Sequence, residues 1–133
     1  MAAYPEGMAT VELTAQTFEQ TVLGDGIVLV DFWAEWCGPC RAFGPIYGDA
    51  SEANPDITFA KVDTDAEQAL SGALNIRSIP TLMAFRDGIG VFSQAGALPR
   101  HVLDDLIGQI RALDMDAVRA EIAAQSSEST PQA

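Results

Sequence analysis

The sequence predicts an α/β fold, in which a central mixed β-sheet of about five strands has helices on both faces. Strand-like and helix-like hydrophobic patterns alternate along the chain, which is typical of strands joined by crossover helices. Residues 27–32 form an almost unbroken apolar run, as expected of a strand in the middle of a sheet that is covered on both sides.

The first half of the chain predicts strand, helix, strand, helix and strand. Residues 10–13 are a short strand candidate, and Thr14 can cap the helix that follows. After the apolar run at 27–32, a second helix begins near Cys37 and ends at a turn before the strand at 57–63. Two parallel strands joined in this way make a right-handed crossover. The residues expected on the inner faces of the two helices are Phe18, Val22 and Leu23, then Ala42, Phe43, Ile46 and Ala50.

The second half of the chain predicts a helix, a hairpin and a long helix. A helix at 64–74 leads to a strand at 82–86. The Asp87-Gly88 dipeptide then predicts a tight turn into an antiparallel strand at 89–94. Pro99 opens the long helix. The residues expected on its inner face are Val102, Leu103, Leu106, Ile107, Ile110 and Leu113.

One domain is expected between two terminal segments. Residues 1–9 are predicted to be a disordered lead-in, 10–113 the domain, and 114–133 a C-terminal extension. The extension should begin as a short helix and become a disordered polar tail from Gln125. The residues expected to cap this helix are Asp114 or Asp116, with Val118 and Ile122 turned inward.

The composition favours a soluble globular protein with an acidic surface. Of 133 residues 48% are apolar, and seven basic against nineteen acidic side chains leave a net charge of −12. This charge disfavours binding to nucleic-acid phosphate or to an anionic membrane, so neither is expected as a partner. The first residues carry no basic and apolar signal pattern. We therefore expect a cytoplasmic protein that works as a monomer.

The chain contains only two cysteines, Cys37 and Cys40, and they flank a Gly-Pro pair where a strand passes into a helix. They are close enough in sequence to close a small disulfide ring. At a helix N-terminus the partial positive charge of the unpaired N–H groups favours thiolate over thiol. Zinc would need four ligands, and besides the cysteines the chain offers only one histidine, His101, far away in sequence. A redox-active pair is therefore favoured, and no metal is expected.

The segment VDFWAEWCGPC at residues 30–40 resembles the active-site segment of thioredoxins, and the resemblance extends over about residues 10–113. It implies the thioredoxin fold and a protein-disulfide reductant that serves cell redox homeostasis. Cys37 would be the attacking nucleophile and Cys40 the resolving thiol. No cofactor would be bound, since the electrons reside on the pair. NADPH would act indirectly through a thioredoxin reductase, and the other partners would be disulfide-containing client proteins.

Four further residues are expected to act on the cysteine pair. Asp31 lies inside an apolar strand, where desolvation should raise the pKa of its carboxyl group. The resemblance implies that Asp31 helps to deprotonate the resolving thiol through a water. It also makes Lys61, the only lysine, the partner of Asp31, although an ordinary surface lysine is the alternative. Gly38 and Pro39 should restrict the backbone and stabilise the disulfide.

A substrate-docking surface is implied by the same resemblance. The bond between Ile79 and Pro80 matches the cis-proline of the family, which packs opposite the cysteines. An extended client segment would pair with the Ile79 backbone in the manner of an added strand. The residues expected to form this mostly apolar surface, together with Gly38 and Pro39, are Trp36, Ile79, Pro80, Gly96 and Ala97. Gly96 could instead be an ordinary turn glycine.

Two other functions remain open from the sequence. A disulfide oxidase or isomerase of the same fold would use the same chemistry in the other direction. Such relatives generally carry histidine where this chain has Pro39, so Pro39 counts against that alternative. A binding or chaperone-like module would make no use of the cysteines and could bind partners through residues 114–133.

Overall fold

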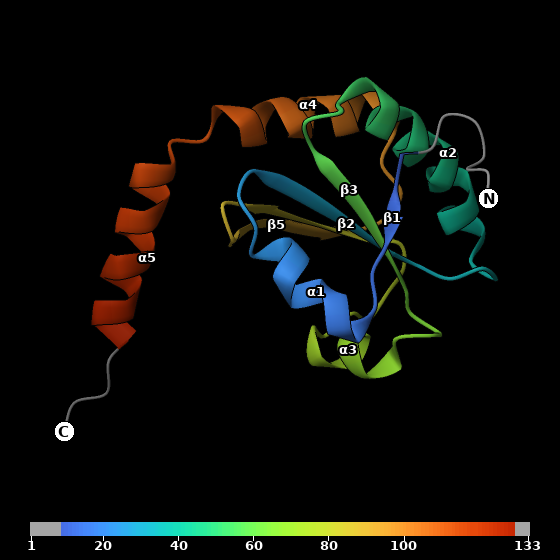
Figure 1. Ribbon diagram of the computed structural model, residues 1–133, viewed down its shortest axis with the longest axis horizontal. Coiled ribbons are helices and arrows are strands. Elements are labelled where there is room, and N and C mark those ends of the chain that lie inside the picture. Colours follow the sequence, from blue (N-terminus) through green and yellow to red (C-terminus); the bar gives the residue numbers. More distant parts are fainter. Residues whose placement is uncertain (1–8, 130–133) are drawn as a thin grey trace.

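The computed structural model describes residues 9–129, with side chains to residue 126 (Figure 1). Residues 1–8 and 130–133, which belong to the segments predicted to be disordered (1–9 and from Gln125 on), lie outside the described residues. Helices and strands alternate as expected. In chain order they are β1 (Val11–Glu12), α1 (Ala15–Val22), β2 (Ile27–Trp33), α2 (Gly38–Ala53), β3 (Thr58–Asp63), α3 (Gln68–Ala73), β4 (Thr81–Arg86), β5 (Ile89–Ala95), α4 (Arg100–Ala112) and α5 (Met115–Ser129).

The five strands form one mixed sheet in the order β1-β3-β2-β4-β5. Strands β1, β3 and β2 are parallel to one another, whereas β4 is antiparallel to β2 and β5 is antiparallel to β4. The predicted tight turn joins β4 to β5, with positive φ angles of 53° at Asp87 and 82° at Gly88. The central position of β2 agrees with its apolar sequence, because both of its faces are buried.

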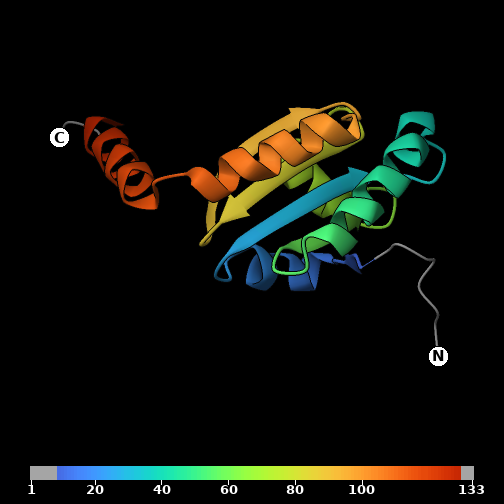
Figure 2. The ribbon, with the colours of Figure 1, turned by 90° about the horizontal axis from the view of Figure 1, so that it is seen from above.

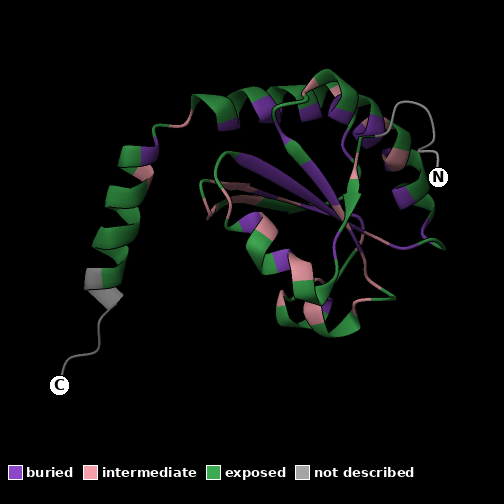
Figure 3. Cartoon of the chain, in the orientation of Figure 1, coloured by how far each residue is buried: buried purple, intermediate pink, exposed green. Residues whose placement is uncertain are grey.

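Helices cover both faces of the sheet (Figures 1 and 2). On one face α2 and α4 pack over the alternate β2 residues Ile27 and Leu29. On the other face α1 packs over Val28, Val30 and Phe32. Figure 3 shows that buried residues are concentrated in the central strands and on the inner sides of α1, α2 and α4. The predicted fold class is confirmed.

Two of the predicted helices have different boundaries or faces. The helix expected at 64–74 begins only at Gln68, because the Asp63 carboxylate accepts the N–H groups of Asp65 and Ala66 and holds this segment in a turn. Leu23 was expected to face inward, but it follows the last residue of α1 and is exposed.

The inner faces of α2 and α4 were predicted only in part. In α2, Phe43 and Ala50 are buried, whereas Ala42 is exposed and Ile46 is half-buried. A fully buried residue that the prediction missed is Tyr47, whose hydroxyl donates a hydrogen bond of 2.8 Å to the Ala60 carbonyl. In α4 the four central apolar residues are buried as expected, but Val102 is exposed and Leu113 is half-buried.

Helix α5 extends away from the rest of the chain (Figure 1). The Asp114 carboxylate caps it by accepting the N–H groups of Asp116 and Ala117, as predicted. Of the two residues expected to turn inward, Val118 is half-buried, whereas Ile122 is 42% exposed and lines an open pocket together with Val91 of β5. The helix also continues from Gln125 through Ser129, where a disordered tail was expected. None of the helices within residues 9–129 combines the length and apolarity needed to cross a bilayer.

Candidate active site

The two cysteines lie at the start of α2 and are joined by a disulfide. Cys37 is the residue that caps the helix, and its Sγ accepts the N–H of Cys40 at 3.2 Å. The sulfur of Cys37 therefore takes one of the unpaired N–H groups of the first turn. When the disulfide is reduced, the same N–H and the helix dipole stabilise a thiolate on Cys37.

Both cysteines are more covered than their position at a helix start leads one to expect. Cys37 is 4% exposed, and Cys40 is 5% exposed. The cover comes from a small apolar cluster in which Ala34, Trp33 and Ile79 pack around the pair. Only a small part of the surface of either cysteine is therefore accessible.

The peptide bond between Ile79 and Pro80 is cis, as the resemblance implied. It places the Ile79 carbonyl oxygen 3.6 Å from the Cys37 Sγ. In the disulfide this sulfur has no proton to donate, whereas a Cys37 thiol could donate to that oxygen. The Pro80 ring is fully buried, so it supports the loop and contributes no surface for a client.

The segment after β5 is bonded through the backbone to the cis-proline. The Gly96 N–H donates a hydrogen bond of 2.8 Å to the Pro80 carbonyl. Gly96 has a backbone φ of 108°, a conformation that residues other than glycine rarely adopt. Ala97 beside it is exposed.

Exposed residues surround the cysteine pair. Trp36 is 66% exposed, and its indole N–H donates to the Asp65 carboxylate at 2.8 Å. Gly38 and Pro39 are also exposed, and Ile79 is half-buried. The predicted docking residues other than Pro80 thus present surface around the disulfide.

Asp31 is buried in the centre of the sheet. It is 1% exposed, and neither of its carboxylate oxygens has a hydrogen-bond partner within the described residues. Desolvation raises the pKa of this carboxyl group to about 7, while Lys61 lowers it and Glu12 raises it. The expected raised pKa is thereby supported by geometry as well as by sequence.

Lys61 lies directly opposite Asp31 in the register of β2 and β3. Its ammonium forms no hydrogen bond with the carboxylate oxygens of Asp31. It lies 4.7 Å from the centre of the Trp33 ring, in a cation–π arrangement. Lys61 therefore influences Asp31 through its charge and without a hydrogen bond.

The chain is similar to thioredoxins over most of its length. The family model described as thioredoxin matches residues 9–109. A putative thioredoxin 2 from Streptomyces coelicolor is 57% identical over 120 residues, which cover 90% of each chain. The thioredoxin of Bacillus subtilis is 36% identical over 77% of this chain and 98% of its own. The chain belongs to the thioredoxin family.

Solved thioredoxin structures agree with this assignment. The thioredoxin of Malassezia sympodialis superposes with a TM-score of 0.69 at 31% identity, over 82% of this chain and 96% of its own. The Plasmodium falciparum thioredoxin gives the same TM-score at 33% identity, over 75% of this chain and 98% of its own. The thioredoxin family model ends within α4, so α5 lies outside it.

Family membership establishes the chemistry of the pair. The protein is a thiol–disulfide oxidoreductase that reduces disulfides through Cys37 and Cys40. The electrons are carried by this redox-active disulfide, and thioredoxins bind no cofactor. The partners that the family implies are a reductase and client proteins.

Two residues near Asp31 were missed by the sequence analysis. Tyr47 lies on the inner face of α2, and the Asp31 charge adds to the burial that raises the pKa of its hydroxyl. The spacing of Phe43, Tyr47 and Ala50 could have revealed it, because these positions recur at helical period. Glu12 lies on β1, and only the pairing of β1 with β3 brings it near Lys61.

Proposed function

We propose that Cys37 is the attacking thiolate, Cys40 the resolving thiol and Asp31 the acceptor of the Cys40 proton. One observation carries this assignment. Cys37 of the disulfide caps the helix that packs over β2, and that strand bears a buried carboxyl group for which residues 9–129 supply no hydrogen-bond partner. A group held in this way takes up and releases a proton near neutral pH.

In the first step the Cys37 thiolate attacks one sulfur of a client disulfide. A new S–S bond joins Cys37 to the client, the client S–S bond breaks, and the other client sulfur leaves as a thiolate. The Cys40 N–H and the start of α2 favour the thiolate form of Cys37 that this step needs.

In the second step Cys40 passes its proton to Asp31 and attacks the Cys37 sulfur. The Cys37–Cys40 disulfide forms, the mixed disulfide breaks, and the second client thiolate leaves. The client has then gained two electrons, and the cysteine pair has lost them. A reductase that draws on NADPH returns the pair to the dithiol.

Client docking is assigned to the exposed residues around the disulfide. Trp36 supplies a large amphipathic side chain, and the small residues Gly96 and Ala97 let a client backbone approach. The Ile79 backbone, close to the Cys37 sulfur, is the partner for an extended client segment. Few contacts with such a surface depend on the side chains of the client, so we expect clients of varied sequence.

We also propose which partners are excluded, the oligomeric state and the location of the protein. A net charge of −12 disfavours nucleic acid and anionic membranes as partners. One chain supplies all the proposed site residues, so we propose a monomer, to be tested by sedimentation. We place its work in the cytoplasm, where thiols are kept reduced.

The test is the equilibrium reduction potential of the Cys37–Cys40 pair in a defined thiol buffer. A potential of about −270 mV supports a reductant. A potential above about −200 mV would favour the oxidase or isomerase, and failure to form a reversible disulfide would favour the binding module. The residue roles are tested separately: Cys40→Ser should trap a mixed disulfide with a client, and Cys37→Ser should not.

A further inference from the structure

Three charged residues form one row across the parallel half of the sheet. Glu12 on β1 is in register with Lys61 on β3, and Lys61 is in register with Asp31 on β2. Residues directly opposite each other on neighbouring strands point to the same face of a sheet. The row therefore runs from the edge strand to the buried carboxyl group, with the single cation in the middle.

The surroundings of Asp31 leave Lys61 as its only nearby cation among the described residues. Strand β4 places the apolar Leu82 opposite Asp31. Helix α2 contributes Tyr47, whose hydroxyl is already engaged by the Ala60 carbonyl, and the cysteine pair. Any change in how Lys61 is shared must therefore alter the ionisation of Asp31.

Glu12 competes for the same cation from the other side. Partial burial raises the pKa of the Glu12 carboxyl group above its ordinary value; the charge of Lys61 opposes this rise, and that of Asp63 adds to it. The Lys61 ammonium lies over the Trp33 ring, and within the described residues neither Asp31 oxygen has a hydrogen-bond partner. The cation is therefore not committed to an ion pair with Asp31, and Glu12 acts on its charge from the neighbouring strand.

We propose that Glu12 is a positioning residue for the active site, which shares Lys61 with Asp31 and so sets how readily Asp31 loses its proton. An ionised Glu12 makes the ionisation of Asp31 less favourable in two ways. Its negative charge repels that of Asp31, and it attracts Lys61, whose positive charge would otherwise act on Asp31 alone. The consequence for catalysis rests on the proposed role of Asp31 as proton acceptor, but the control of Asp31 ionisation does not.

The experiment is a titration of Asp31 in the full-length disulfide form, followed by NMR of carboxyl-labelled aspartate. The wild-type midpoint is expected at about 7. Glu12→Gln removes one negative charge and frees Lys61, so both effects should lower the midpoint, by at least about 0.3 pH units. A midpoint equal to that of the wild type would overturn the proposal.

Two matched variants separate charge from structure. Glu19→Gln changes the net charge by the same amount as Glu12→Gln, but at an exposed position on α1, and should leave the midpoint of the Asp31 titration unchanged. Glu12→Asp keeps the charge and should stay closer to the wild type than Glu12→Gln. A midpoint that moves alike in Glu12→Asp and Glu12→Gln would indicate a role for side-chain length, and the proposal would fail.

The pH profile of client reduction distinguishes this proposal from the role of Asp31 itself. With both correct, Glu12→Gln should move the profile to lower pH in parallel with the Asp31 midpoint. If Asp31 is not the proton acceptor, Asp31→Asn will leave the rate of client release unchanged, while Glu12→Gln will still move the NMR midpoint.

Discussion

Asp31 and Lys61 face each other in register on neighbouring parallel strands, yet the Lys61 ammonium lies over the Trp33 ring, 4.7 Å from its centre. The Asp31 oxygens have no hydrogen-bond partner within the described residues. A buried carboxylate in this state destabilises the fold, because burial desolvates its charge and no bonded cation among the described residues compensates for this. The site therefore keeps a buried titratable group at the expense of stability.

The first prediction concerns the pH dependence of stability. The pKa of Asp31 is about 7 in the folded protein, against an ordinary value of 3.8. Between these values the folded state holds a proton that the unfolded chain has lost, so the free energy of unfolding should fall as pH rises from about 4 to about 7. Above pH 7 the ionisation of Asp31 should lower the free energy of unfolding by on the order of 4 kcal/mol relative to its value near pH 4.

Asp31→Asn tests this contribution by urea unfolding across that pH range. The variant should be more stable than the wild type above pH 7, and the difference should shrink toward pH 4. It should also slow client release at neutral pH, because the proposed proton acceptor is gone. Equal stability of the two proteins at pH 8 would contradict the raised pKa.

The second prediction concerns the junction of β4 with the end of α4. The Arg86 guanidinium donates to three backbone carbonyls there, those of Ile110, Arg111 and Leu113, at 2.8–3.2 Å. Ile110 and Arg111 lie in the last turn of α4 and Leu113 is its C-cap residue, so these carbonyls lie where a helix runs out of N–H partners; that of Ile110 also accepts the Leu113 N–H at 3.3 Å. Arg86→Ala should lower the free energy of unfolding by about 1–3 kcal/mol.

Arg100→Ala is the matched control for Arg86. Within the described residues Arg100 pairs with Asp104 one turn along α4, and the two side chains are 40% and 49% exposed. Its loss should change stability by less than about 0.5 kcal/mol. Chemical denaturation of both variants decides the matter, and a small effect at Arg86 would show that water replaces the guanidinium.

The third prediction concerns client docking at Trp36. This side chain is exposed beside the disulfide and is held by the Asp65 carboxylate. Trp36→Ala should lower kcat/KM for a protein disulfide by about five- to thirty-fold, as expected for loss of an aromatic anchor. The rate of reduction of a small aliphatic disulfide should change little, since such a molecule is too small to contact the docking surface at Trp36.

Leu23→Ala serves as the control for Trp36. Leu23 is another large exposed apolar side chain, and it lies at the end of α1, outside the proposed docking surface. It should leave both reactions unchanged. An equal loss with protein and small disulfides in Trp36→Ala would mean that Trp36 acts on the cysteine chemistry and not on docking.

The order of the elements could be predicted from sequence because it depends on local patterns. The apolar run of β2, the Asp-Gly turn and the helical period of α4 each carry their signal within a few residues. The cysteine pair and Asp31 were found for the same reason. A carboxyl group inside an apolar run, and a Cys-x-x-Cys motif after it, are both visible without a structure.

The remaining features depend on contacts between distant segments. The cover over Cys37 comes from Ile79, which the chain brings back only after two more elements. The relation of Glu12 to Lys61 depends on the pairing of β1 with β3. The late start of α3 depends on the Asp63 side chain, which competes with the helix for the same N–H groups.

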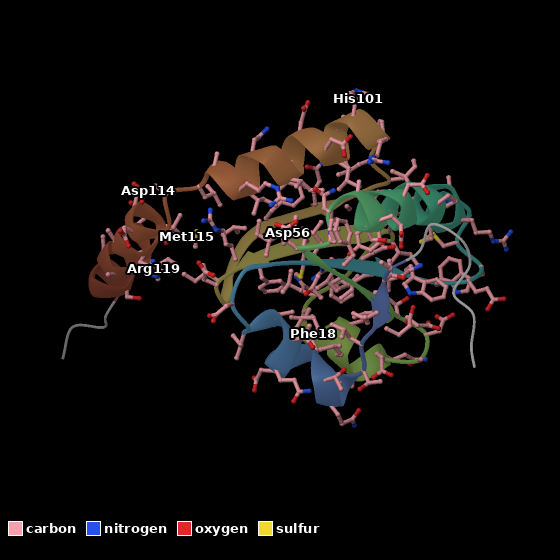
Figure 4. All side chains as sticks on the ribbon, turned by 45° about the horizontal axis from the view of Figure 1, so that its top comes forward. Phe18, Asp56, His101, Asp114, Met115 and Arg119 are labelled. Atoms are coloured by element: carbon pink, nitrogen blue, oxygen red, sulfur yellow. A yellow bond between two sulfur atoms is a disulfide. The ribbon has the colours of Figure 1, made fainter. Side chains whose placement is uncertain are left out.

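The fourth prediction concerns how far α5 depends on the rest of the chain. Figure 4 labels Met115 and Arg119 near the start of this helix, and contacts with the body are found there. Met115 is 7% exposed, and the Arg119 guanidinium lies 3.8 Å from the Asp87 carboxylate in the β4–β5 turn. Farther along the helix Ile122 is exposed. The first turn should therefore contribute to stability, and the later turns should not.

Met115→Ala and Ile122→Ala make a matched pair for this prediction, because each removes a large apolar side chain from the same helix. Met115→Ala should lower the free energy of unfolding by about 2 kcal/mol, since a buried side chain is lost and a cavity remains. Ile122→Ala should change it by less than about 0.5 kcal/mol, and alanine even favours the helix. Thermal and urea unfolding of the full chain measure both. Similar losses in the two variants would mean that α5 packs against the body along its length, and no loss in either would mean that the whole helix is independent of the domain.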